Sequence, residues 1–160
     1  GHFCAPARLL VGGPGGGGGW GGHLFLKRNQ KNSLLFFEGR AVFGEHYARV
    51  LSQASVGLGL LTKRFPELHT TRTFEIPACG TALATVSTAE TTRFFLPDQA
   101  LFFSDYQALG QQVLSLLQDS VALQRLSAAG RAAVTHGGFD NDSVVRQILD
   151  RCGLLQHMPE

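Results

Sequence analysis

The residues best suited to chemistry lie close together in one stretch, residues 70–80 (TTRTFEIPACG). This stretch holds one arginine, Arg72, one carboxylate, Glu75, and three threonines, Thr70, Thr71 and Thr73. A cation and several hydroxyl groups beside a helix N-terminus are typical of anion binding, because the first N–H groups of a helix have no partner within it. We therefore expect a ligand to bind at this stretch.

The flanking sequences predict where the stretch lies in the fold. Residues 56–61 (VGLGLL) precede it and residues 81–86 (TALATV) follow it, and both runs are short, apolar and free of charge. Such runs are typical of parallel strands buried on both faces. In open α/β sheets, ligands bind at the edge where the strands end and the helices begin. The pattern places Arg72 and Glu75 at that edge.

The helix between these two strands contains a proline, Pro77. Because proline is tolerated in the first turn of a helix but not in its interior, we expect the helix to begin near Thr73 or Phe74, with Glu75 and Pro77 in its opening turn. Gly80 is expected to end the helix.

Helix and strand patterns alternate along the rest of the chain. Strands are expected within residues 33–43 and at 100–103, and helices at 45–54 and 89–95. A longer helix is expected from a cap at residues 104–105 to residue 117, another from a start at residues 119–120 to residue 133 or 134, and a last one after a cap at residues 141–143. Tyr47 lies on the apolar stripe of the first helix, and Val144, Val145, Ile148 and Leu149 are expected to be buried in the last. The alternation predicts an α/β domain with a Rossmann-like, doubly wound parallel sheet.

Composition narrows the function classes. The chain has 160 residues, 44% of them hydrophobic, and a formal net charge of +2, which is too weak to indicate a nucleic-acid partner. No run is long enough for a transmembrane segment. The three cysteines have no CxxC spacing and the six histidines no paired ligand spacing, so no disulfide framework and no metal site are predicted. We expect a cytoplasmic protein.

The chain is expected to divide into three parts. Residues 1–32 are rich in glycine and are expected to be poorly ordered, since glycine offers little to pack. Residues 33–152 form the Rossmann-like domain, and residues 153–160 a frayed tail. Because the chain begins with Gly1 rather than methionine, we expect it to be a piece of a longer protein.

The segment RTFEIPACGTALATV, preceded by YARVLSQASVGLGLL, resembles the C-terminal half of GT-B glycosyltransferases. The nearest branch is the spore-maturation (CgeB-like) group. Two later segments, residues 100–105 (ALFFSD) and 136–143 (HGGFDNDS), also fit this group, and the resemblance covers roughly residues 34–152. It implies a domain that binds the nucleotide of a nucleotide diphosphate sugar, with the sugar donor as substrate and no metal or other cofactor.

The resemblance also assigns roles to single residues. Glu75 matches the acidic residue that hydrogen-bonds the ribose hydroxyls, and a carboxylate can accept from two such donors. Arg72 lies in an Arg-x-Phe-Glu run usual in this branch and is expected near the diphosphate. Glu67 stands eight positions before Glu75, where many GT-B enzymes carry a second glutamate near the transferred sugar, although its Gly-Phe-Gly context is missing here. His69 is expected to touch phosphate or sugar.

Other roles for these residues remain open. Glu75 can simply interact with the helix dipole, Arg72 can pair with Glu75 or Glu67, and the threonines can cap the helix. Cys79 is expected to be a small buried residue without activation.

The function of the whole chain also has two readings. The acceptor-binding N-terminal half of a GT-B enzyme is absent, and the glycine-rich start carries no clean diphosphate motif, so the chain alone is not expected to catalyse transfer. The alternative is a non-catalytic GT-B-like domain that acts as an interaction or sugar/nucleotide-sensing module. A receiver-type domain is more distant, because no paired aspartates follow a first strand.

Overall fold

The computed structural model describes residues 9–12, 23–29, 32–38, 43–61 and 66–154. The strands are β1 (Leu9–Gly12), β2 (His23–Asn29), β3 (Asn32–Glu38), β4 (Val56–Gly59), β5 (Ala82–Val86) and β6 (Leu101–Phe103). The helices are α1 (Gly44–Ser52), α2 (Arg72–Ala78), α3 (Thr91–Phe94), α4 (Tyr106–Gln118), α5 (Ser120–His136) and α6 (Asn141–Arg151).

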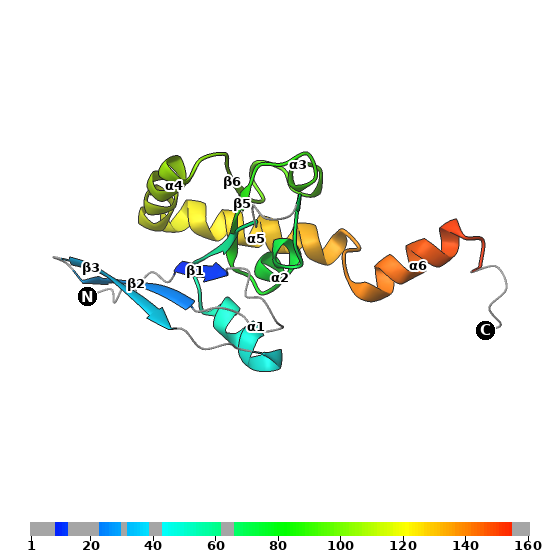
Figure 1. The fold of residues 1–160 in the computed structure, drawn as a ribbon, viewed down its shortest axis with the longest axis horizontal. Coiled ribbons are helices and arrows are strands. Elements are labelled where there is room, and N and C mark those ends of the chain that lie inside the picture. Colours follow the sequence, from blue (N-terminus) through cyan, green and yellow to red (C-terminus); the bar gives the residue numbers. More distant parts are fainter. Residues whose placement is uncertain (1–8, 13–22, 30–31, 39–42, 62–65, 155–160) are drawn as a thin grey trace.

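Within the described residues, four strands form a parallel sheet in the order β1-β4-β5-β6, and β2 and β3 form a separate antiparallel hairpin (Figure 1). Val56 of β4 lies opposite Leu9 of β1 and opposite Ala82 of β5. The parallel sheet with helices against both faces confirms the predicted Rossmann-like α/β fold. Strands β1 and β2 lie within residues 1–32, the part that the sequence predicts to be poorly ordered, and residues 13–22 lie outside the described residues.

Two apolar clusters fill the two faces of the sheet, because successive side chains of a strand point to opposite faces. One face packs against α1, α2 and the end of α5, and its buried residues are Leu51, Ile76, Leu83, Phe95, Ala100 and Val134. The other face packs against α4 and the start of α5, and its buried residues are Val56, Leu58, Ala82, Ala84, Phe103, Leu109 and Val113.

Helix α2 differs from its sequence-based prediction in one respect. It begins at Arg72, so Pro77 lies in its last turn and not in its opening turn. Proline deprives the helix of one hydrogen bond there, but the helix ends at the next residue, Ala78, in a Schellman motif with Gly80 at φ +79°. The Thr81 N–H donates to the Ile76 carbonyl and the Gly80 N–H to the Pro77 carbonyl. The predicted role of Gly80 as the helix stop is confirmed.

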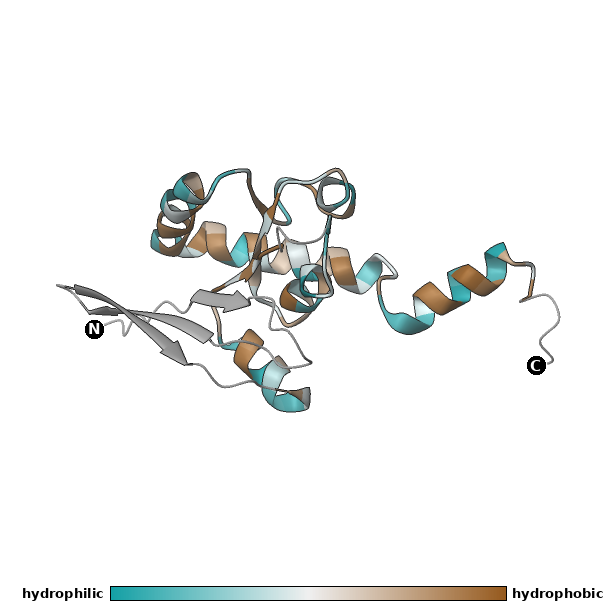
Figure 2. Ribbon diagram, viewed as in Figure 1, coloured by the Kyte–Doolittle hydropathy of each residue, from teal (hydrophilic) through white to brown (hydrophobic). Residues whose placement is uncertain are grey.

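Helix α6 shows the second difference. None of its residues is fully buried, and Val144, Val145 and Ile148 are exposed, so their predicted burial is wrong. The helix extends away from the body of the domain (Figure 1), and brown, apolar stretches recur along it (Figure 2). Amphipathic spacing predicts which residues share a face, but not whether another element covers that face. Asp140 caps this helix through the Ser143 N–H.

Two glycines in the middle of helices predict opposite effects of a methyl group. A Cβ at Gly130 of α5 would lie 2.6 Å from the Gln99 carbonyl oxygen, whereas a Cβ at Gly110 of α4 would meet nothing within 4 Å. We expect Gly130→Ala to lower the free energy of unfolding by about 1–3 kcal/mol through overpacking. The matched control, Gly110→Ala, should raise it by about 0.5–1 kcal/mol through helix propensity. Urea unfolding followed by circular dichroism measures both, and equal effects would contradict this packing.

Candidate functional site

The predicted site residues lie at the carboxyl end of β4, on the loop before α2 and on the first turn of that helix. Arg72 and Glu75 are partly buried, Thr71 is exposed and Thr73 is buried. A second loop, which follows the carboxyl end of β5, lies against this one, because the Thr88 hydroxyl donates to the Leu68 carbonyl at 2.8 Å. The fold therefore brings two loops together at the predicted edge of the sheet.

Glu75 has a hydrogen-bond donor that the sequence did not indicate. The hydroxyl of Tyr47, on α1, donates to Glu75 Oε2 at 2.8 Å. Burial raises the pKa of Tyr47 well above its ordinary value, and the hydrogen bond to the Glu75 carboxylate raises it further. The Tyr47 hydroxyl is thus held in its protonated, donating form. The only sequence signal was the rule that a buried tyrosine hydroxyl needs a partner.

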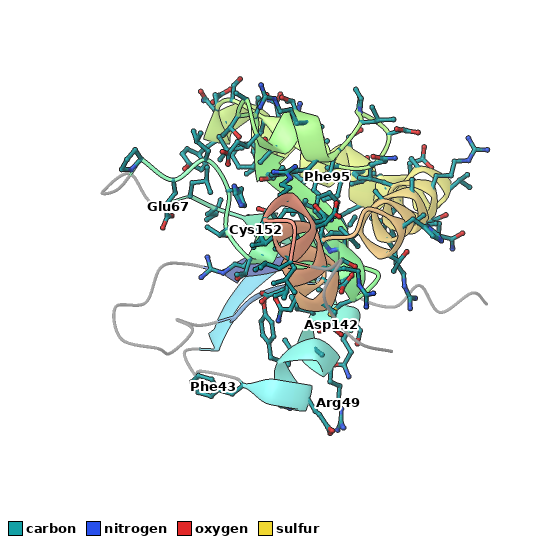
Figure 3. The ribbon with its side chains drawn as sticks, turned by 90° about the vertical axis from the view of Figure 1, so that its right-hand side faces the viewer. Phe43, Arg49, Glu67, Phe95, Asp142 and Cys152 are labelled. Carbon is teal, nitrogen blue, oxygen red and sulfur yellow. The ribbon has the colours of Figure 1, made fainter. Side chains whose placement is uncertain are left out.

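The charge of Glu75 also acts on Arg72. Burial lowers its pKa, because a charged guanidinium loses hydration, while the negative charges of Glu75 and Glu67 act in the opposite direction. Both carboxylates that the sequence named as partners of Arg72 therefore act on it. Glu67 is exposed, and Figure 3 shows its side chain extending outward from the loop before α2.

His69 contacts an acidic residue, Glu90. Its Nδ1 atom forms a short hydrogen bond with Glu90 Oε2, and the two side chains remain 39% and 37% exposed. The imidazole ring also packs edge-on against Phe74 and Phe94, with centroids 5.8 and 5.1 Å away. His69 therefore joins the loop before α2 to the loop before α3, and no sequence pattern predicted its contact with Glu90.

The three threonines have different environments. The Thr73 hydroxyl accepts a hydrogen bond from the Thr70 N–H at 3.2 Å, and Thr73 is only 1% exposed. This bond satisfies a loop N–H, and Thr71 at the N-cap of α2 makes no side-chain cap hydrogen bond, so the capping alternative is not observed there. The Thr71 carbonyl accepts from Phe74 N and Glu75 N. Among the described residues, the buried hydroxyls of Thr70 and Thr85 have no hydrogen-bond partner. Both lie near the carboxyl ends of the strands, Thr85 on β5 itself.

Cys79, at the end of α2, has a raised pKa, because burial and the nearby Glu75 carboxylate both disfavour the thiolate, while Arg131 acts against them. This environment agrees with the inert thiol that the sequence predicts. Among the described residues, no group of three or more His, Cys, Asp and Glu side chains is arranged to hold a metal ion. No helix in the described ranges has the length and apolar character to cross a membrane.

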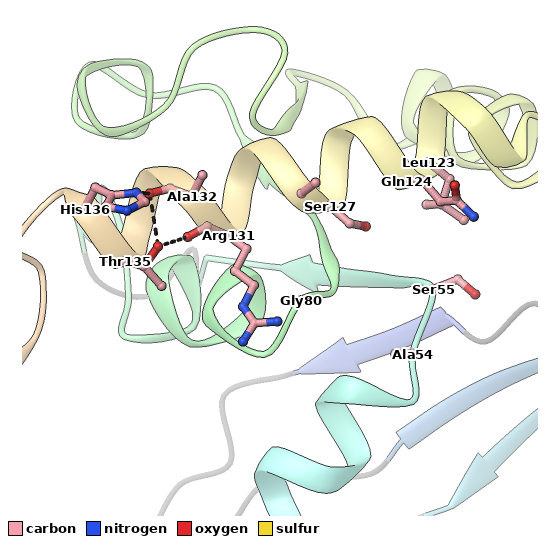
Figure 4. Close-up of a pocket in the computed structure, with 11 residues that line it drawn as sticks. Ala54, Ser55, Gly80, Leu123, Gln124, Ser127, Arg131, Ala132, Thr135 and His136 are labelled. Atoms are coloured by element: carbon pink, nitrogen blue, oxygen red, sulfur yellow. Dashed lines mark hydrogen bonds between the residues drawn. The ribbon is translucent and has the colours of Figure 1, made fainter.

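A cavity of about 590 Å³ lies at the opposite edge of the sheet, where β4 and β5 begin. Ser55, Gly80, Ser127 and Arg131 are among its lining residues. Figure 4 shows the Arg131 side chain extending from α5 toward the loop at Gly80. None of the predicted site residues lines this cavity, so it is separate from the candidate site.

The Tyr47–Glu75 contact predicts how stability changes with pH. Because the pKa of Tyr47 is higher in the folded chain than its ordinary value of 10.0, its contribution to stability is complete below that pH and is lost as the pH rises above it. We expect the free energy of unfolding to fall more steeply from about pH 9 to 11 for the wild type than for Tyr47→Phe. The slope for Glu75→Ala should lie between those two, because Tyr47 stays buried in that variant but loses its hydrogen bond to Glu75. Urea unfolding at several pH values measures this, and equal slopes would count against it.

Comparison with known proteins places the chain in a family. The family model described as glycosyl transferase-like matches residues 2–150, which is most of the sequence. No curated protein matches the chain significantly. The match agrees with the Rossmann-like α/β fold, and the chain belongs to the glycosyl transferase-like family.

Proposed function

We propose that the chain is the donor-binding half of a GT-B glycosyltransferase, nearest the CgeB-like branch, and that it binds a nucleotide diphosphate sugar. The observation that carries the proposal is the position of Glu75. It lies on the first turn of α2, the helix that follows β4, close in sequence to Arg72, in a chain of the glycosyl transferase-like family. Ligands of open α/β sheets bind at this edge.

The donor would meet groups that match its chemistry. Glu75 uses one acceptor position for the Tyr47 hydroxyl, and its remaining lone pairs would accept from the two ribose hydroxyls. Arg72 would pair with the diphosphate, whose charge compensates the hydration that burial removes from the guanidinium. The buried hydroxyl of Thr70, which has no partner among the described residues, would gain one from a phosphate or sugar oxygen.

The other predicted residues would contribute less. Thr71 is exposed at the start of α2 and is available to the ligand, whereas the Thr73 hydroxyl is already engaged with the loop. His69 would reach the ligand only beside Glu90, its present partner. Glu67, exposed on the loop, is the candidate for a role near the transferred sugar.

Transfer itself would need the acceptor-binding half, because the reaction takes place between the two halves. In the complete protein, catalysis would rest on stabilising the departing diphosphate with Arg72. We therefore expect the chain alone to bind nucleotide without turnover. The cytoplasmic location stays a prediction from the sequence.

The alternative function, a non-catalytic interaction or sensing module, is favoured by a different observation. At the carboxyl edge, Phe74 stacks on Phe139 with centroids 4.7 Å apart and packs edge-on against Phe94. In this packing and in the His69–Glu90 contact, side chains at this edge are engaged with one another, and a ligand would otherwise contact them.

Calorimetric titration with UDP, GDP and ADP tests the proposal. We expect one nucleotide to bind and Glu75→Ala to weaken its binding by about 1–3 kcal/mol, the cost of losing hydrogen bonds to a charged group. The matched control is Glu45→Ala, because Glu45 also lies on the first turn of a helix but is exposed on α1, and it should bind like the wild type.

Two results would overturn the donor-site proposal. One is a folded wild-type chain, shown by circular dichroism, that binds none of the three nucleotides, which is the result the interaction module predicts. The other is equal weakening of nucleotide binding by Glu75→Ala and Glu45→Ala, because the effect would then come from the change in net charge and not from a contact made by Glu75.

A further inference from the structure

One hydrogen bond near the site joins α1 and α2, the two helices that flank β4 in sequence. Tyr47 on α1 and Glu75 on α2 are 28 residues apart, and the tyrosine hydroxyl lies 2.8 Å from Glu75 Oε2. Tyr47 packs with its ring against the cluster that contains Leu51 and Ile76. The packing fixes the ring, so the hydroxyl is presented to the carboxylate from a rigid support.

This contact limits the freedom of Glu75. A glutamate side chain on a partly exposed helical turn loses rotamer entropy when it binds a ligand, and that loss weakens binding. A hydrogen bond from a fixed donor removes much of that freedom before the ligand arrives. One oxygen is then held by Tyr47, and the other oxygen keeps both of its acceptor positions.

The charge of the donor matters as well. The Tyr47 hydroxyl stays protonated because its pKa is raised, first by burial and then by the hydrogen bond to Glu75. It therefore donates to the carboxylate at neutral pH. Because this donor occupies one acceptor position of Glu75 Oε2, the other oxygen can accept from the hydroxyl groups of a ligand.

We propose that Tyr47 is a positioning residue for Glu75, and that it orients the carboxylate toward a vicinal diol and so sets the preference of the site for ribonucleotides over nucleotides without ribose hydroxyls. This inference rests on the proposed function of Glu75. Tyr47 does not touch the ligand; it acts through Glu75.

The test compares each nucleoside diphosphate (UDP, GDP and ADP) with its 2′,3′-dideoxy form in calorimetric titrations of the full chain. We expect Tyr47→Phe to weaken binding of the ribonucleotide by about 3–10-fold, the range for one lost hydrogen bond, and to leave the dideoxy form unchanged. A merely structural role of Tyr47 would weaken both forms equally, and that result would overturn the inference.

The matched control is Tyr106→Phe, because Tyr106 is the other tyrosine of the chain and lies on α4, against Phe103 on the opposite face of the sheet. It should bind both forms like the wild type. An effect as large as that of Tyr47→Phe would overturn the inference.

A double variant separates this inference from the proposed function. If Tyr47 acts through Glu75, Tyr47→Phe combined with Glu75→Ala should bind the ribonucleotide no more weakly than Glu75→Ala alone. If Glu75→Ala weakens binding but Tyr47→Phe does not, the positioning role fails and the donor site stands. If Glu75→Ala has no effect, both fail. This readout holds even where Tyr47→Phe lowers the melting temperature, because folded chain is titrated in each case.

Discussion

The close packing of α2 against the sheet is the constraint on which the rest of this structure depends. A Cβ at Gly57 of β4 would lie 2.7 Å from Ile76 Cγ2, so only glycine lets the helix come this close to the strand. Helix α2 also contacts α5, where a Cβ at Gly130 would lie at an ordinary contact distance of 3.5 Å from Pro77 Cβ. The close approach that requires glycine is therefore the one between Gly57 and Ile76. Packing, not helix propensity, stabilises a helix of this length.

The candidate site follows from that position. Because α2 begins at the carboxyl end of β4, its first turn carries Arg72 and Glu75 to the edge of the sheet where the loop after β5 also arrives. The Thr88–Leu68 hydrogen bond and the His69–Glu90 contact join the two loops. The Tyr47 hydroxyl then reaches Glu75 from α1, across the same face. The groups that would recognise a nucleotide are held by three elements rather than by one flexible loop.

The two edges of the sheet differ in character. The amino edge holds the open cavity with Arg131, whereas the carboxyl edge holds the partly buried Arg72 and Glu75, whose charges act on each other. A cavity shows only where there is room for a ligand. Partly buried ionisable groups with shifted pKa values are costly for the fold and are found more often at functional sites. The general rule that ligands of open α/β sheets bind where the strands end favours the carboxyl edge. The exposed apolar face of α6 is a separate feature, and nothing in the described residues covers it.

The sequence by itself determined the alternation of helices and strands, the helix stop at Gly80, and the caps expected at residues 104–105 and 119–120. In the structure, Asp105 and Asp119 each accept hydrogen bonds from two N–H groups at the start of the following helix. These features are local, since they depend on residues within one turn of each other. Only the tertiary structure decided that Tyr47 meets Glu75, that Thr73 is buried, that Pro77 falls in the last turn and that α6 stands uncovered. The physical reason is that these outcomes depend on which elements pack together, and residues 28 positions apart carry no local signal of their contact.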